Sequence, residues 1–289
     1  MSDPQTTRDA DPGVRLKQAI RARWSGDRST AIRKPAAHLG VARVLRRLSE
    51  DVAVRGACSA VTGVVGRRPS IEDALEFAYG FEFGGFDTSI LPTQMPSEIE
   101  SLLRYLQPLR PRTVLEIGTD RGGTFFLFAT VAEDDALLVS VDLPLGPFGG
   151  GYAKRRGKLY RAFAGRGQRI ELLRQDSHDG RTVEAVERIL GGRLVDLLFI
   201  DGDHSYEGVA ADFRLYSPFV RDGGSIVFHD IVPGPVEHVG GVPLFWQALK
   251  ASEVVTEFVA DWEQGGYGLG VLTQSHDSRW HRTGAQIKI

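Results

Sequence analysis

From residue 113 onward, short apolar runs alternate with helical segments, and this alternation constrains the fold of the 289-residue chain more than any other feature. The apolar runs predict strands at 113–118, 137–142, 169–173, 195–200 and 224–228. Helical segments lie near 122–132, 153–164, 180–190 and 206–217, and the tail adds a helix near 242–252 and strands near 254–260 and 267–273. Near-continuous apolar strands that alternate with helices are typical of a parallel sheet covered on both faces. The sequence therefore predicts an α/β domain.

The N-terminal part of the chain is basic, and we expect residues 1–80 to form a helical extension. Residues 1–68 carry 14 Arg and Lys against 6 Asp and Glu, whereas the whole chain has a net charge of -2. Basic segments can bind nucleic acid or anionic membranes. Here the charges interleave with Ala, Val and Leu, as on a helix surface. We therefore expect neither partner, and the helices favour a homo-oligomer; the polar residues 1–12 are predicted to be disordered.

Residues 81–112 are predicted to form a lid loop followed by a helix, before a main domain at 113–289. The runs 81–86 and 90–96 combine apolar residues with Gly and Pro, so this loop should pack on the domain. Ser97-x-x-Glu100 fits a capping box that opens the helix.

Composition excludes several other classes of protein. Cys58 is the only cysteine, so a disulfide scaffold is excluded. No apolar run reaches the roughly 18 residues of a membrane span, and the first residues lack the apolar core of a signal peptide. The sequence therefore predicts a soluble, cytoplasmic protein.

The ends of the first two strands carry features of a nucleoside-binding βαβ unit. A glycine-rich turn, 116–124, follows the first strand, and Asp142 ends the second. A dinucleotide site has a glycine where this turn has Asp120, whose charge would repel a pyrophosphate. S-adenosylmethionine, with its cationic sulfonium and ammonium, tolerates nearby acids. The turn favours that cofactor over NAD, although an ordinary βαβ turn with incidental acids stays open.

The third strand is followed by Gln175-Asp176-Ser177. These residues stand where an adenine edge would lie if Asp142 holds the ribose. Asp and Ser are also ordinary helix-capping residues, so both interpretations stay open.

The ends of the fourth and fifth strands carry a second polar group. Asp201-Gly-Asp203-His204 follows one strand and His229-Asp230 ends the other. Neighbouring strands lie about 4.8 Å apart, so these side chains can converge. Converging acids need a cation or protons to relieve their repulsion. Two carboxylates suit Mg²⁺, and an imidazole extends the choice to Mn²⁺ or Fe²⁺; the alternative is that the acids are loop caps and His229 is a packed histidine.

Residues 113–230 resemble class I S-adenosylmethionine-dependent methyltransferases. The runs 195–209 (VDLLFIDGDHSYEGV) and 223–230 (GGSIVFHD) are similar to the group that includes macrocin O-methyltransferase and cephalosporin hydroxylase-like proteins. The resemblance extends upstream to the Gln94-x-Pro96 loop and downstream to Gly265–Val271. It implies a Rossmann-like seven-stranded sheet of order 3-2-1-4-5-7-6, with strand seven antiparallel.

The resemblance also implies roles for residues at matching positions. The cofactor is implied to contact Glu116, Gly118, Gly122, Gly123 and Thr124 with its methionine part, Asp142 with its ribose, and Asp176 and Ser177 with its adenine. Thr119 and Asp201 are further cofactor-binding candidates. Asp201, His229 and Asp230 match metal-ligand positions, although relatives often have Glu or Asp at the place of His229. His204 matches a proposed general base, with Asp203 as the competing candidate.

These expectations combine into a predicted function. The chain is expected to transfer a methyl group from S-adenosylmethionine to a hydroxyl of a small molecule, such as a natural product or sugar, with help from a divalent metal. Two alternatives stay open: a nicotinamide-dependent oxidoreductase, and a non-catalytic binding protein with a methyltransferase fold.

Overall fold

The computed structural model describes residues 41–83, 88–144 and 151–275, and the side chains from Ser49 onward. The chain divides into two compact units, Met1–Ser49 and Glu50–Ile289. Helix α2 (Val41–Val65) continues from the first unit into the second. The predictions for residues 1–40, including the disorder of 1–12, lie outside the described residues. All that follows concerns the second unit.

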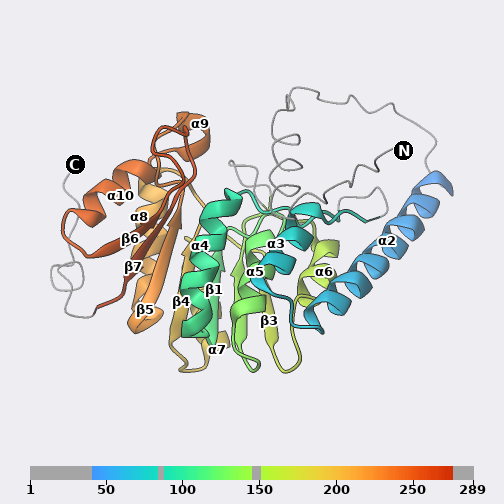
Figure 1. Cartoon of the computed structure of the whole chain (residues 1–289). Coiled ribbons are helices and arrows are strands. Elements are labelled where there is room, and N and C mark those ends of the chain that lie inside the picture. Colours follow the sequence, from blue (N-terminus) through green and yellow to red (C-terminus); the bar gives the residue numbers. More distant parts are fainter. Residues whose placement is uncertain (1–40, 84–87, 145–150, 276–289) are drawn as a thin grey trace, which may run out of the picture. The chain divides into compact units, whose positions relative to one another are not determined.

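The second unit is built on a seven-stranded sheet of order β3-β2-β1-β4-β5-β7-β6 (Figure 1). Its strands are β1 (Thr113–Ile117), β2 (Leu137–Val141), β3 (Arg169–Leu173), β4 (Val195–Ile200), β5 (Val220–His229), β6 (Val255–Phe258) and β7 (Leu269–Thr273). The pairs among β1 to β5 are parallel, whereas β7 runs antiparallel to both β5 and β6. The predicted strand order and the antiparallel last strand are confirmed.

Helices cover both faces of this sheet. One face carries α3 (Ile71–Gly80), α4 (Pro96–Leu106), α5 (Gly123–Val131) and α6 (Gly157–Arg161), and the other carries α7 (Gly180–Leu190), α8 (Tyr206–Tyr216) and α10 (Val242–Lys250). Successive strand residues alternate between the two cores: Phe199 packs with the α3–α6 face, whereas Leu198 packs with the α7–α10 face. This double burial explains why the strands are nearly continuous apolar runs.

Short elements complete the chain. They are the 3₁₀ turns η1 (Gln107–Leu109), η2 (Lys154–Arg156) and η3 (Ser217–Phe219) and the helix α9 (Val236–Val239). The helix predicted at 153–164 is therefore a 3₁₀ turn followed by the short α6. None of the described helices has the length and apolar character that a membrane-spanning segment needs.

The predicted capping box at the start of α4 is wrong. The helix begins at Pro96 with Met95 as its N-cap, and no side chain caps it. Proline fits the first helical position because its fixed φ suits the helix and its missing N–H has no helical partner there. Ser97 therefore lies inside the helix, where its carbonyl accepts a hydrogen bond from Ser101 Oγ at 2.7 Å.

The turn after β1 meets the turn after β4 at Gly118. This glycine has a φ of 84°, and a Cβ there would lie 1.9 Å from the carbonyl oxygen of Asp201. Only a residue without a side chain permits this approach. The contact brings the predicted cofactor turn directly beside the first residue of the predicted metal group.

Candidate functional site

Two buried carboxylates lie at the ends of β1 and β2. Glu116 is fully buried; its Oε1 accepts a hydrogen bond from Thr124 Oγ1 at 2.6 Å, but its Oε2 has no partner among the described residues. Asp142 is 4% exposed, and its Oδ2 also has no hydrogen-bond partner among the described residues. A buried oxygen without a donor costs about 1–3 kcal/mol. The pair therefore fits a ligand that brings its own donors, such as an ammonium group and ribose hydroxyls.

Burial also changes how these two carboxyl groups titrate. Desolvation raises the pKa of Glu116 to about 8, against the lowering effect of the Thr124 hydrogen bond. Desolvation, followed by the charge of Asp120, raises the pKa of Asp142 to about 7. A nearby positive charge or hydrogen-bond donor would favour the ionised forms.

The glycine turn between these carboxylates is tightly packed. Gly122 has a φ of 82°, and a Cβ there would lie 2.9 Å from the ring of Tyr160, whose hydroxyl donates to the Asp120 carbonyl at 2.5 Å. A Cβ at Gly123 would lie 2.3 Å from the carbonyl oxygen of Ile90. The Thr119 and Ser140 hydroxyls share a hydrogen bond of 2.7 Å. Packing thus accounts for part of the glycine pattern that the sequence assigns to the cofactor.

The residues predicted to hold an adenine lie in a turn after β3. Asp176 is exposed, and its Oδ1 accepts a hydrogen bond from His178 N at 2.9 Å. The Ser177 carbonyl accepts one from the Tyr216 hydroxyl at 2.7 Å. The turn is held by the protein itself, and the Asp176 carboxylate lies at its surface.

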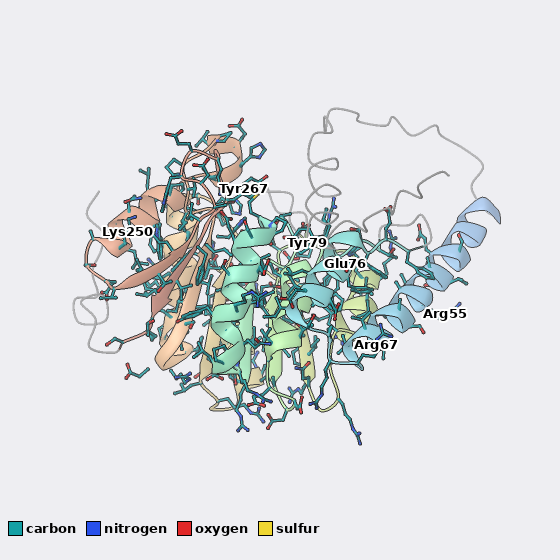
Figure 2. The ribbon with its side chains drawn as sticks, viewed as in Figure 1. Arg55, Arg67, Glu76, Tyr79, Lys250 and Tyr267 are labelled. Carbon is teal, nitrogen blue, oxygen red and sulfur yellow. The ribbon has the colours of Figure 1, made fainter. Side chains whose placement is uncertain are left out.

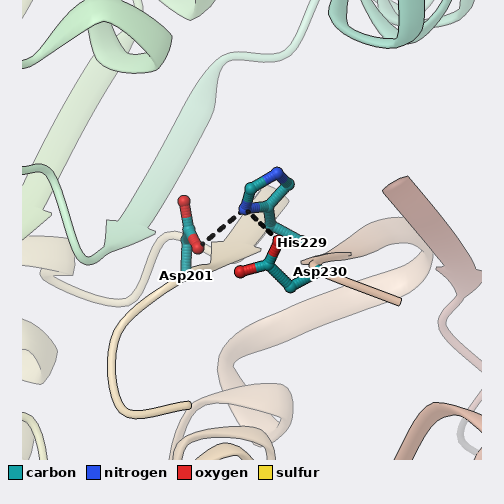
Figure 3. Close-up of side chains that lie close together, drawn as sticks. All are labelled: Asp201, His229 and Asp230. Atoms are coloured by element: carbon teal, nitrogen blue, oxygen red, sulfur yellow. Dashed lines mark hydrogen bonds and ion pairs between the residues drawn. The ribbon is translucent and has the colours of Figure 1, made fainter. Parts of the chain in front are cut away.

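Asp201, His229 and Asp230 converge at the ends of β4 and β5 (Figure 3). One ligand atom from each lies within 4.8 Å of the others. His229 Nδ1 lies 3.1 Å from Asp201 Oδ1 and 3.6 Å from Asp230 Oδ1. His229 Nε2 is buried and has no hydrogen-bond partner among the described residues. Two carboxylates and an imidazole are a donor set that suits Mn²⁺ or Fe²⁺, and the carboxylates suit Mg²⁺.

His204 belongs to the same cluster, whereas Asp203 does not. His204 Nε2 lies 3.4 Å from Asp201 Oδ1, and its Nδ1 lies 3.4 Å from Asp230 Oδ2. Asp203 instead accepts a hydrogen bond from Ser205 N at 2.8 Å and packs against Gly208 at the start of α8. Of the two predicted bases, the geometry places only His204 beside the converging carboxylates.

The positive charges of protonated His204 and His229 offset the negative charges of Asp201 and Asp230. Burial acts to lower the pKa of His229 and of His204, but Asp201 and Asp230 outweigh it and raise both values to about 9. Burial acts to raise the pKa of Asp201, but His229 and His204 hold it below its ordinary value. The acids thus attract positive charge, as the sequence predicts, and either protons or a metal ion can supply it.

Residues 115–231 match the family model described as a methyltransferase domain. This match, on a sheet of order β3-β2-β1-β4-β5-β7-β6, decides the identity of the region. It is a class I methyltransferase domain. The matched residues include both the Glu116–Asp142 carboxylates and the Asp201–Asp230 cluster.

Individual relatives of this methyltransferase domain are distant or uncharacterised. The chain is 32% identical over 118 residues to "Uncharacterized protein R132" of Acanthamoeba polyphaga mimivirus, covering 41% of this chain and 51% of that protein. It is 32% identical over 171 residues to "Uncharacterized protein y4gI" of Sinorhizobium fredii, covering 57% of this chain and 17% of that protein. The chain thus spans about half of the first relative and less of the second. A solved structure, the O-methyltransferase TomG of Streptomyces achromogenes, involved in tomaymycin synthesis and in complex with SAM, matches with a TM-score of 0.48, 19% identity, and coverage of 71% and 89%.

Sequence reasoning missed two residues that support the cluster of the methyltransferase domain. Gln94 Nε2 donates to Asp201 Oδ2 at 2.9 Å. Glu98 Oε2 accepts from Gly268 N at 2.9 Å, and the adjacent Tyr267 N donates to Asp230 Oδ1 at 3.0 Å. Gln94 appears in the sequence only as part of a loop resemblance, and nothing near Glu98 signals a partner 170 residues away.

His178, for which the sequence gives no functional signal, pairs with a buried acid. His178 Nε2 lies 3.2 Å from Oδ1 of Asp212, which is fully buried in α8. The hydrogen bond to Asp212 raises the pKa of His178 to about 9, against the opposing effect of burial.

This pair predicts a pH-dependent contribution to stability. Because the pKa of His178 is higher in the folded than in the unfolded chain, its stabilisation is complete below about pH 6.5 and is lost as the pH rises through about 9. Thermal melts of the wild type and His178→Asn should therefore differ by about 2–5 °C near pH 6 and converge above about pH 9.5. A difference between the two proteins that is the same at both pH values would contradict the ionic role of His178.

Proposed function

We propose that this chain is an S-adenosylmethionine-dependent O-methyltransferase that acts, with the help of a divalent metal, on a hydroxyl of a small molecule such as a natural product or sugar. One observation carries the proposal: the unpartnered carboxylate oxygens at the ends of β1 and β2 lie next to the Asp201–His229–Asp230 cluster, through the Gly118–Asp201 contact. A methyl donor and an activated acceptor need such adjoining sites.

The cofactor would be held by carboxylates whose free oxygens match its donors. Glu116 Oε2 suits the ammonium group, and Asp142 Oδ2 suits the ribose hydroxyls. Glycines and Thr124 at the start of α5 supply backbone N–H groups near the helix N-terminus, which favours the carboxylate of the methionine part. Asp176 and Ser177 would face the adenine, as the resemblance implies.

His204 is the residue that we propose as the general base. Its Nδ1 donates to the His238 carbonyl at 2.5 Å, and a carbonyl only accepts, so Nδ1 carries a proton. Without a cation the His204 imidazole is protonated, since its pKa is raised to about 9. A cation at the cluster would lower that pKa, and Nε2, on the side of Asp201, would then take the proton from the acceptor hydroxyl. A divalent metal held by Asp201, His229 and Asp230 would lower the pKa of that hydroxyl. Asp201 and Asp230 orient the imidazole from both sides.

Asp120 argues against the nicotinamide-dependent alternative. Its negative charge acts on Asp142, and it would also repel the pyrophosphate that a dinucleotide places against such a turn. A scaffold without catalysis, the other alternative, would not require unpartnered carboxylates. A homo-oligomer through the N-terminal helices and a cytoplasmic location stay predictions.

The proposed activity can be tested with isotopically labelled S-adenosylmethionine. A panel of hydroxylated natural products and glycosides would be screened for label transfer, with Mg²⁺, with Mn²⁺, with Fe²⁺ and with EDTA. We expect transfer to an acceptor oxygen that falls on chelation and returns with metal. Calorimetry with S-adenosylmethionine and NAD completes the test, since binding of NAD alone would overturn the proposal.

His204→Gln should separate catalysis from cofactor binding. We expect kcat to fall about 10²–10⁴-fold, the usual contribution of a general base, while the Kd for S-adenosylmethionine changes less than about threefold. Asp203→Asn is the matched comparison, because Asp203 accepts a hydrogen bond from Ser205 N and lies outside the cluster. If kcat falls with Asp203→Asn and not with His204→Gln, the assignment of the base is wrong.

A further inference from the structure

Gln94 connects the segment before α4 to the metal-ligand candidate Asp201. The residue is only 1% exposed, although its side chain is polar. The backbone carbonyl of Gln94 accepts a hydrogen bond from the hydroxyl of Tyr79 at 2.7 Å. Tyr79 is itself buried on α3 (labelled in Figure 2). Arg156 Nη2 holds the same segment through the Ser89 carbonyl at 2.6 Å. The backbone of Gln94 is therefore fixed at a defined distance from the end of β4.

The Gln94 amide and the His229 imidazole contact different oxygens of the Asp201 carboxylate. Gln94 Nε2 donates to Oδ2 at 2.9 Å, whereas Oδ1 faces His229 Nδ1 at 3.1 Å. A carboxylate can only accept a hydrogen bond, so the amide must present its nitrogen to Asp201. The interaction leaves one carboxylate oxygen directed at the imidazole of the cluster and the other held by the amide.

The side-chain oxygen of Gln94 does not explain why a polar residue is buried at this position. Gln94 Oε1 is buried and has no hydrogen-bond partner among the described residues. A buried amide kept only for packing would be satisfied at both ends or replaced by an apolar side chain. The unpartnered Oε1 lowers the stability of the fold, whereas the hydrogen bond from Nε2 orients the Asp201 carboxylate.

We propose that Gln94 is a positioning residue that orients Asp201 for a divalent cation at the Asp201–His229–Asp230 cluster. The inference rests on the metal site of the proposed function. Residues that hydrogen-bond to metal-ligating carboxylates typically change metal affinity about 10–100-fold when they are removed. Gln94 would thus make the segment before α4 part of the metal site without touching the metal.

Binding of Mn²⁺ alone to the full chain tests this role. The variant Gln94→Met keeps the length of the side chain and removes its donor, and it should raise the Kd for Mn²⁺ about tenfold in calorimetry or in electron paramagnetic resonance of free Mn²⁺. Gln107→Met is the matched control, because Gln107 is exposed at the end of α4, and it should bind Mn²⁺ as the wild type does. Tyr79→Phe, which removes only the anchor of the Gln94 backbone, should raise the Kd by about threefold.

The outcomes separate this inference from the proposed function. If Asp201→Asn does not weaken Mn²⁺ binding, or the wild type does not bind Mn²⁺, both the metal site and the inference fail. If Asp201→Asn abolishes binding while Gln94→Met binds as the wild type does, only the inference fails. A lower melting temperature of Gln94→Met with an unchanged Kd shows a merely structural role and also overturns it. Should Gln94→Met not fold, the Kd of Tyr79→Phe decides, and a value equal to that of the wild type counts against Gln94.

Discussion

Replacing Asp142 by asparagine is expected to raise the Kd for S-adenosylmethionine about 100-fold. The ionised Asp142 would accept hydrogen bonds from the ribose, and each bond to a charged group contributes about 1.5–3 kcal/mol. Losing about 2.7 kcal/mol corresponds to a hundredfold change in affinity. Calorimetric titration of the variant with S-adenosylmethionine measures this change directly.

The same substitution should not lower the stability of the ligand-free protein. Burial raises the pKa of Asp142 to about 7, so above that pH the folded protein holds a buried charge that the asparagine variant lacks. We therefore expect Asp142→Asn to melt at or above the wild-type temperature near about pH 8. Asp135→Asn, at an exposed acid before β2, is the control for removing a charge. A stable variant that binds the cofactor as tightly as the wild type would remove Asp142 from the cofactor site.

The sequence predicts the centre of the sheet well because nearly every residue of β1, β2 and β4 is buried. Each apolar run from 113–118 to 195–200 corresponds to a strand within one residue, since both faces of these strands meet helices. The largest difference is at β5, which begins at Val220 and not at 224. Its first residues, Val-Arg-Asp-Gly, carry no apolar pattern, and the register between β4 and β5 shifts between Val195 and Leu197. Backbone pairing forms that part of the strand, and a pattern of hydrophobic residues cannot predict such pairing.

The convergence of Asp201, His229 and Asp230 at the sheet edge can be predicted from the sequence, whereas the residues that hydrogen-bond to this cluster cannot. Asp201 and His229-Asp230 end strands that are neighbours in any sheet of this kind, so strand ends alone bring them together. Gln94 reaches Asp201 from 107 residues away and depends on the path of a loop. The pair His178–Asp212 likewise joins a loop to a helix. Periodicity describes elements, whereas these contacts are set by the connections between them.

Replacing Asp230 by asparagine is expected to impair both catalysis and metal binding. Asp230 has a φ of 59°, a conformation that asparagine adopts readily, and the asparagine oxygen can still accept the hydrogen bond from Tyr267 N. The substitution therefore removes a charge and keeps the backbone. We expect kcat to fall about 10³-fold and the Kd for Mn²⁺ to rise at least about tenfold, while the Kd for S-adenosylmethionine stays within about threefold.

Direct metal binding makes the Asp230 result independent of turnover. Asp135→Asn again controls for the loss of one negative charge, and it should leave both dissociation constants and kcat unchanged. If Asp230→Asn lowers kcat but binds Mn²⁺ as the wild type does, Asp230 acts on catalysis through His204, whose Nδ1 lies 3.4 Å from its Oδ2. Full activity of the variant would show that neither a cation nor His204 depends on this carboxylate. That result would leave the convergence of acids at the ends of β4 and β5 as a feature of folding, balanced by the protonated histidines alone.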